Sequence, residues 1–347
     1  MAFKRFNPAD DIVENQKTTI SSGLWSGGSA TLTSFFTQSA NGNITGSFLE
    51  LYNEDPNLSS SAESQFSVGY AHIDGSGSAG NTTKLTTGGR QTAALYSQFR
   101  NVLLAPNTTH FEFTSSPTAS GDKDFYFVSF QRARQREKID PGNWEIKLSG
   151  NMPAQFKDDT ITLIDDSGAT TNPTVNQGGR VFNVVSGSIS DGINTTAANE
   201  PSANGGSYGL FYPDLGLILL NAPKLEVSGG LGTHARSSDT FDNRPKAFFN
   251  ALVSGSSFQA RREEEISSTN YFVRVNNKDF NFSANPTFST GSDGSLTQAS
   301  FFKDPKTFIT QVGLYNDENE LLAIAKLSKP ILKSYSREAI IKVKLDF

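Results

Sequence analysis

Ala339-Ile-Ile-Lys-Val-Lys-Leu-Asp-Phe347 is the stretch that decides the fold, because its apolar and charged side chains alternate. Residues of one parity are apolar, namely Ile341, Val343, Leu345 and Phe347. This period of two, carried in part by β-branched residues, predicts a half-buried β-strand. Chain termini normally fray unless a sheet holds them. We therefore expect the C-terminal stretch to be a built-in strand of the main sheet.

Two further apolar runs precede this strand, at 308–315 and 320–327, and the polar residues 316–319 separate them. A polar cluster between two apolar runs is typical of a β-hairpin. Twenty-seven Phe residues and abundant Gly, Ser, Thr and Asn fit many short strands joined by turns. The expected fold class is α+β and mainly β, with antiparallel sheets or a sandwich and two short helices packed on the core.

The predicted helices span 91–104 and 244–253. In the first, Thr92, Leu95 and Phe99 lie three and four residues apart, which gives an apolar stripe. In the second, Asn243 is suited to the N-cap and Pro245 to the first turn.

A change in composition near residue 150 suggests how the chain is divided into segments. Between 150 and 239 the apolar runs are short and the Gly/Ser/Asn/Thr-rich connections are long. We predict an N-terminal arm at 1–20, a first core segment at 21–149, a loop-rich β insertion at 150–239 and a second core segment at 240–347. On this interpretation the two core segments form one core and the insertion projects from it.

Composition excludes several classes of function. The net charge is −5 and the pI is about 5.4, which disfavours a general nucleic-acid-binding protein. No run approaches the 18 or more apolar residues of a membrane span, and the first residues lack the apolar core of an export signal. Cysteine is absent, so neither disulfides nor thiolate metal sites can form. His72, His110 and His234 lack ligand spacing, and we expect no metal or cofactor.

The densest basic run is Gln131-Arg-Ala-Arg-Gln-Arg-Glu-Lys138. In an extended strand, Arg132, Arg134 and Arg136 would share one face. The run could bind an anion or RNA, but it could equally be a solvated strand end or one side of a subunit interface. Because no aromatic platform accompanies it and the chain is acidic, we expect no nucleic-acid partner.

Local patterns that could carry chemistry are weak. Adjacent carboxylates occur in polar or turn contexts at 10–11, 158–159, 165–166 and 263–265. In a strand, adjacent side chains point to opposite faces, so none of these groups would form an acid/base pair by itself. Gly75-x-Gly77-x-x-Gly80 matches a dinucleotide fingerprint, but Asn81-Thr-Thr83 follows it instead of a helix. The acidic segment 316–320 lacks the spacing of an EF-hand loop. We expect no catalytic residues.

Several stretches resemble virion structural proteins of contractile-tailed phages, especially the cyanophage-type myoviruses. They are spread along the chain outside 150–239, at 23–27, 32–36, 96–104, 140–148, 270–280, 285–288, 304–308 and the hairpin 312–328. The closing hairpin and final strand also resemble the end of baseplate wedge proteins. The resemblance implies a non-enzymatic subunit that assembles in the host cytoplasm with other tail or baseplate proteins and with copies of itself.

Three hypotheses follow. The first is a structural subunit of the tail, in the baseplate wedge or, alternatively, in the neck or elsewhere in the virion. Its expected contact regions are the arm 1–20, the loops of 150–239 and the charged strand 131–138. The second is a receptor- or glycan-binding tail protein that uses the insertion, where Tyr208 and Tyr212 are the candidate contact residues. The third is an enzyme such as a polysaccharide depolymerase, which would need carboxylates that converge across a cleft.

Overall fold

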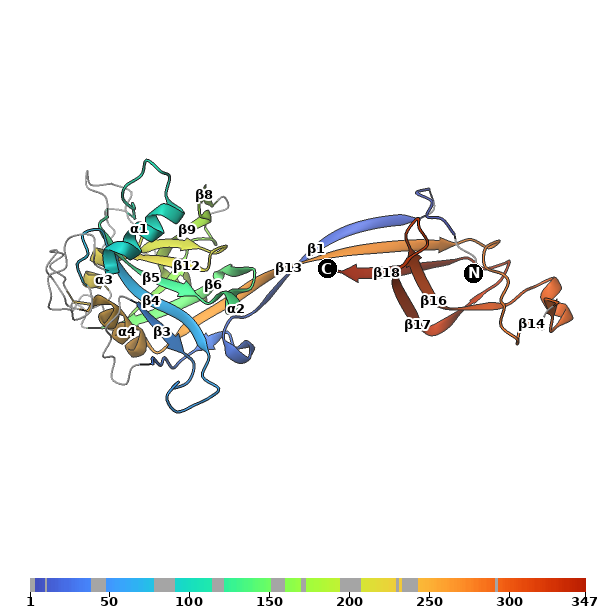
Figure 1. Cartoon of the computed structure of the whole chain (residues 1–347), viewed down its shortest axis with the longest axis horizontal. Helices are drawn as coiled ribbons and strands as arrows, with labels where there is room; N and C mark the ends of the chain where they lie inside the picture. The colour runs from blue at the N-terminus through green and yellow to red at the C-terminus, as the bar shows by residue number, and fades with distance from the viewer. Residues whose placement is uncertain are drawn as a thin grey trace. The chain divides into compact units, whose positions relative to one another are not determined.

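The structure is a computed structural model of the chain, and it is mainly β with antiparallel pairing throughout (Figure 1). It describes residues 4–9, 11–38, 48–77, 91–113, 122–150, 160–169, 173–193, 207–228, 231–232, 243–290 and 293–347. These residues form two compact units. Unit 1 comprises 1–19 and 265–347, and unit 2 comprises 20–264. The boundaries fall inside two strands, β1 (Ile12–Gly23) and β13 (Phe258–Val275). The predicted fold class, α+β and mainly β, is confirmed.

Unit 2 is built on one antiparallel sheet. From the first half of β13, the strands follow in the order β6 (Lys138–Ser149), β7 (Thr160–Asp165), β9 (Gly179–Ser188), β11 (Gly209–Tyr212), β12 (Leu217–Asn221), β5 (Asp124–Phe130), β4 (Ser64–His72) and β3 (Phe48–Tyr52). Three short strands lie beside this path: β2 (Thr31–Leu32), β8 (Thr174–Asn176) and β10 (Gly192–Ile193). The helices are α1 (Gln91–Leu103), α2 (Arg132–Gln135), α3 (Ala222–Ser228) and α4 (Arg244–Gly255).

The central strands of this sheet are covered on both faces. In β5, Tyr126 and Val128 belong to the larger buried cluster, whereas Phe125 and Phe127 belong to a second cluster on the opposite face. Alternate residues of a strand point to opposite faces, so an almost wholly apolar strand needs cover on both sides. Helix α4 packs on the larger cluster through Phe248, and α1 packs on the second one.

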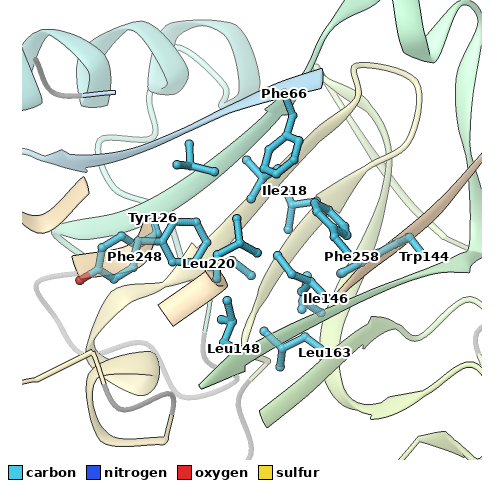
Figure 2. Packing of buried hydrophobic residues seen from close by; sticks show 14 of the residues in the cluster. Phe66, Tyr126, Trp144, Ile146, Leu148, Leu163, Ile218, Leu220, Phe248 and Phe258 are labelled. Atoms are coloured by element: carbon cyan, nitrogen blue, oxygen red, sulfur yellow. The ribbon is translucent and has the colours of Figure 1, made fainter. Parts of the chain in front are cut away.

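The sheet curls around the larger cluster, which Figure 2 shows from close by. Phe258 of β13 and Phe66 of β4 come from strands far apart in the sheet order, yet their rings lie 5.2 Å apart. Trp25 fills the gap between these strands, with its ring 5.0 Å from Phe258 and 5.5 Å from Phe66. Its indole N–H donates to the carbonyls of Ala30 and Phe258. Helix α4 contacts both β4 and β6, so it too connects opposite sides of the curl.

Both predicted helices exist. In α4, Asn243 is the N-cap and its side chain accepts the N–H of Lys246, while Pro245 lies in the first turn. In α1, Tyr96 and Leu103 are buried against the second cluster, and Phe99 packs partly against it. Helices α2 and α3 were not predicted.

Unit 1 has a small core of its own. The second half of β13 pairs with β18 (Ala339–Asp346), and β16 (Thr307–Tyr315) forms a hairpin with β17 (Leu321–Lys333). The core consists of three buried residues, Val275, Ile341 and Val343, with side chains of the hairpin packed partly against them. A minor hairpin of β14 (Ser289–Thr290) and β15 (Ser295–Leu296) and a short 3-10 turn (Ala299–Phe302) complete the unit.

The C-terminal strand exists and is part of the large sheet through its pairing with β13, as predicted, but it lies in unit 1. Ile341 and Val343 are buried as expected, whereas Phe347 is 76% exposed. Strand β18 pairs with β13 in unit 1 and lies outside the core of unit 2. The hairpin at 308–327 is confirmed, with the turn at Asn316–Asn319.

The structure also groups the segments differently from the predicted division. The stretch 150–239 does not project from a core, because β7, β9, β11 and β12 are inner strands of the unit 2 sheet. Residues 21–149 and 265–347 do not form one core, because they fall in different units. The physical reason is that a short apolar strand flanked by long loops can lie at the centre of a sheet as readily as in an insertion.

Candidate assembly interface

Exposed apolar side chains are concentrated in unit 1. Among the described residues, 13 of the 21 exposed large hydrophobic side chains lie in this unit, which has 102 of the 347 residues. They are Phe6, Ile12, Val13, Phe280, Phe282, Phe302, Phe308, Leu321, Leu322, Ile324, Tyr335, Ile340 and Phe347. Large exposed apolar patches on a folded protein commonly mark surfaces that bind another protein. A unit whose core cluster has three buried residues and that exposes this much apolar surface is suited to assembly.

The hairpin β16–β17 contributes to this surface with its outer face. Val312, Leu314 and Ala325 pack toward the core of unit 1. The exposed residues Leu322 and Ile324 do not belong to that core, and Leu322 is 67% exposed. Ile324 is paired with Gly313, and the side chains of Tyr315 and Leu321 lie over that glycine, since a Cβ there would be 2.9 Å from the Tyr315 ring and 3.3 Å from Leu321. A two-stranded hairpin with one poorly covered face is marginally stable by itself, so a partner surface would stabilise it.

Strand β1 is exposed on both faces within unit 1. Every residue from Ile12 to Thr19 is exposed, although β1 lies beside β13 in the sheet. Apolar Ile12 and Val13 are included. No other strand in the described part of the sheet pairs with its outer edge. Open edges of this kind are available to a strand of another chain.

A cluster of phenylalanines forms a further apolar area. The rings of Phe288 and Phe301 stack with centroids 5.0 Å apart, and Phe282 meets Phe288 edge-on at 5.7 Å. Next to them, Phe302 is 82% exposed. Aromatic residues are enriched at the centres of protein interfaces. This cluster is therefore a second apolar area of unit 1 on which a partner can pack.

Two carboxylates of unit 1 with shifted pKa values form hydrogen bonds and ion pairs within the unit. Burial alone would raise the pKa of Asp11, but the N–H groups of Asn7 and Arg274 and the Lys4 ammonium outweigh it and lower the pKa. The pKa of Glu338 is lowered by its hydrogen bond and ion pair with Arg274. These carboxylates fasten the chain segments of unit 1 to one another.

Lys333 is fully buried and bonded through its ammonium group. Its Nζ donates to the carbonyls of Asn277 (2.8 Å) and Ser334 (2.9 Å) and to Oδ1 of Asn281 (3.0 Å). Burial lowers the pKa of Lys333, while Asp279 and Glu338 oppose this shift. Three hydrogen bonds satisfy the three donors of an ammonium group. Lys333 therefore ties together the loop after β13 and the end of β17.

The basic run at 131–138 is not a strand. Arg132 and Arg134 lie on the short helix α2 and Arg136 follows it, so the three do not share a strand face. Arg134 pairs with Glu63 at 2.5 Å and Arg136 with Glu264 at 3.1 Å, while Arg132 is exposed. The predicted common face of three arginines is wrong, because a helical turn rotates successive side chains by about 100°.

Tyr208 and Tyr212 are buried side chains of unit 2, with exposed fractions of 1% and 0%. Tyr208 packs in the larger cluster and Tyr212 in the second, on opposite faces of the sheet. Neither tyrosine can serve as a surface contact in this structure. The hypothesis of glycan binding through these two residues therefore loses its sequence support.

The adjacent carboxylates at 165–166 have structural roles. Asp165 accepts the N–H groups of Gly142 (2.8 Å) and Ser167 (2.9 Å), and Asp166 accepts the backbone and side-chain N–H groups of Asn183. Burial raises the pKa of Asp165, while these hydrogen bonds oppose the shift. The pair fixes the loop after β7. Positions 10 and 158–159 lie outside the described residues.

Other candidates for metal or cofactor binding are also limited. In the described part of the chain, no three His, Asp or Glu residues are grouped as a metal site. In the glycine-rich motif, Gly77 has φ +74° and a Cβ there would lie 2.4 Å from the Tyr70 ring. Gly77 thus allows close packing, and within the described residues the next helix is α1, from Gln91. Gly80 and His234 lie outside the described residues.

A buried polar cluster surrounds Arg244 at the start of α4. Its guanidinium donates to the Tyr126 hydroxyl (2.8 Å), to Glu226 (3.3 Å) and to the carbonyls of Leu231 and Gly232. Burial raises the pKa of Tyr126, so its hydroxyl stays protonated. These contacts connect α3, α4 and β5. The arrangement is that of an internal structural ion pair.

The apolar surface of unit 1 was only partly foreseeable. The run Glu320-Leu-Leu-Ala-Ile324 has apolar residues at both parities, and this departure from alternation signals a strand with apolar side chains on both faces. No comparable sequence pattern indicated that the phenylalanines at 280, 282 and 302 are exposed.

Comparisons with known proteins add no relative: no protein-family model, curated protein or solved structure matches this chain. Among the described residues, no helix has the length and apolar character that crossing a membrane requires.

Proposed function

We propose that this chain is a non-enzymatic structural subunit of a contractile phage tail, with the baseplate wedge as its place. The observation that carries the proposal is the contrast between the three-residue core of unit 1 and its thirteen exposed large apolar side chains. Such a surface becomes covered when partner subunits bind.

The charge distribution also favours unit 1 as the unit that is buried in the assembly. The sequence gives unit 1 a formal net charge of +1 and unit 2 a formal net charge of −6. A nearly neutral unit rich in exposed apolar groups suits burial in an assembly, because little charge has to lose its hydration. The acidic unit 2 suits a solvated body that stays soluble before assembly. The resemblance of 312–328 and 339–347 to baseplate wedge proteins provides the link to the tail.

Location in the particle is the first test. A phage whose copy of this protein carries an epitope tag would be labelled with antibody-coupled gold and imaged in negative stain. Label at the baseplate supports the proposal. Label at the capsid or neck refutes the baseplate assignment, and absence of the protein from purified particles refutes the structural role.

A matched pair of substitutions tests the surface itself. Leu322→Asp places a charge on the outer face of the hairpin, and Val102→Asp makes the same change on the surface of α1 in unit 2. Both positions are exposed, so both variants should fold. We expect Leu322→Asp to be excluded from particles at least about tenfold, which corresponds to a 1.4 kcal/mol weaker contact. Val102→Asp should be incorporated normally, and equal incorporation of both would contradict the role of unit 1.

A further inference from the structure

The hairpin of unit 1 ends in an acidic tip of fixed shape, which we define as residues 316–322. Asp317, Glu318 and Glu320 are exposed there, and Leu321 and Leu322 follow directly. No Lys or Arg occurs between Lys306 and Lys326. The tip therefore combines three negative charges with two exposed leucines.

Hydrogen bonds hold the shape of this tip. The side-chain oxygen of Asn316 accepts the N–H groups of Glu318 (3.1 Å) and Glu320 (2.7 Å). The N–H of Asn316 donates to the carbonyl of Glu320 at 3.1 Å, and Asn319 takes a left-handed conformation with φ +66°. Little conformational entropy is left to lose when a preorganised turn binds a partner.

A complementary surface lies on β18, and we call it the basic strand face. Ile341 and Val343 point toward the hairpin, so the alternate residues of β18 point away from it. These outward residues are Ile340, Lys342, Lys344 and Asp346. The face thus offers the exposed apolar side chain of Ile340 beside two lysines.

The lysines of this face are only partly neutralised. Lys344 pairs with Asp346 at 2.9 Å, and the Lys342 ammonium lies 5.4 Å from the Phe272 ring. Among the described residues, no carboxylate is within ion-pair distance of Lys342. Lys342 and Lys344 are both exposed. A carboxylate arriving at this face would therefore find an accessible ammonium group, that of Lys342, with no ion-pair partner among the described residues.

We propose that the acidic tip of one copy of this chain binds the basic strand face of a second copy. Carboxylates of the tip meet Lys342 and Lys344, and Leu321 and Leu322 pack on Ile340. Within one chain the hairpin packs on the opposite face of β18, so the two surfaces meet only between copies. The negative net charge of unit 2 makes it a poor alternative partner for an acidic tip.

The proposed contact joins two different surfaces of the same chain. Contacts of this kind are heterologous and build closed rings or open filaments, depending on the rotation between copies. The inference rests on the proposed function, because both assign assembly to unit 1. It goes further by naming the partner as another copy of the chain.

The test uses two charge-reversed full-length variants. The tip variant carries Asp317→Lys and Glu318→Lys, and the face variant carries Lys342→Glu and Lys344→Glu. Either variant alone brings like charges together, so we expect its self-association to weaken at least about tenfold. In an equimolar mixture every mixed contact is again complementary, and assembly should return. One chain carrying all four changes should assemble as well.

Size-exclusion chromatography with light scattering, at low and high salt, measures the outcome. A control variant with Lys303→Glu and Lys306→Glu changes exposed charges of unit 1 outside both surfaces and should assemble like the parent. Far-UV circular dichroism checks that each variant is folded. A monomeric parent chain overturns the proposal, and so does a mixture of folded variants that stays monomeric.

Failure of this proposal can be told apart from failure of the proposed function. Gold label at the baseplate together with a monomeric parent chain would leave the tail role intact and would assign the tip to a different partner. Self-association of the parent chain together with label elsewhere in the particle would support the contact between copies and refute the baseplate assignment.

Discussion

Deleting residues 341–347 should unfold unit 1 and leave unit 2 folded. The deletion removes Ile341 and Val343, two of the three buried core residues of unit 1. Burial of each such side chain contributes about 1.5–3 kcal/mol, so the pair contributes about 3–6 kcal/mol. Most of the strand pairing between β18 and β13 disappears as well. Domains are stable by about 5–15 kcal/mol, and a unit with so small a core lies at the low end of that range.

Hydrogen exchange measured by mass spectrometry separates the two units. In the deletion variant, peptides from 307–333 should exchange like an unfolded chain, while peptides from 124–130 and 217–221 should keep the protection of the parent. Ile340→Ala is the matched control, because Ile340 lies on the outward side of β18 and is 69% exposed. This control should change stability by no more than about 0.5 kcal/mol.

Two results would refute the reasoning. Full protection of 307–333 in the deletion variant would mean that β18 is not needed to hold unit 1 together. Loss of protection in β5 and β12 would mean that the chain unfolds as one body and that the division into two units is incorrect.

Three further predictions concern stability. Phe258→Ala should destabilise unit 2 by about 3–5 kcal/mol, because it empties the site beside Trp25, whereas Phe48→Ala at an exposed position should cost less than about 1 kcal/mol; chemical denaturation measures both. Arg244→Met removes the buried ion pair with Glu226 and should cost about 3–5 kcal/mol in the same assay, a result that a loss below 1 kcal/mol would contradict. Asp11 has a folded pKa below its usual 3.8, so its contribution to unit 1 is complete above that value and is lost as the pH falls through the lowered folded pKa; the protection of 307–333 against exchange, taken relative to the intrinsic rate at each pH, should therefore fall on acidification more in the parent than in Asp11→Asn.

The elements that the sequence predicted correctly depend on local patterns. Alternation at 339–346 identifies a strand, Asn316 identifies a turn, and Asn243 with Pro245 identifies a helix start. Each signal is complete within about ten residues, because it arises from side-chain direction or from a local hydrogen bond.

The incorrect predictions depended on contacts between distant segments. The carboxylates at 263–265, expected in a polar or turn context, lie within the 18-residue strand β13. Lys138 and Arg136, more than 120 residues earlier, supply its ion pairs with Glu263 and Glu264. The charged residues did not indicate a strand, because the side chains that neutralise them are remote in sequence. For the same reason, nothing local revealed that the short strands of 160–221 form the centre of the larger sheet.

The tryptophans have a practical consequence for experiments. Trp25 and Trp144 are the only two in the chain, and both are buried in unit 2. Indole emission therefore monitors unit 2 alone, and unit 1 carries no indole signal. A tryptophan introduced at Tyr335, which is exposed in unit 1, would supply that unit with its own fluorophore. Unfolding of the two units could then be followed separately in one denaturant titration. Binding of a partner over the new tryptophan would appear as a blue shift of its emission.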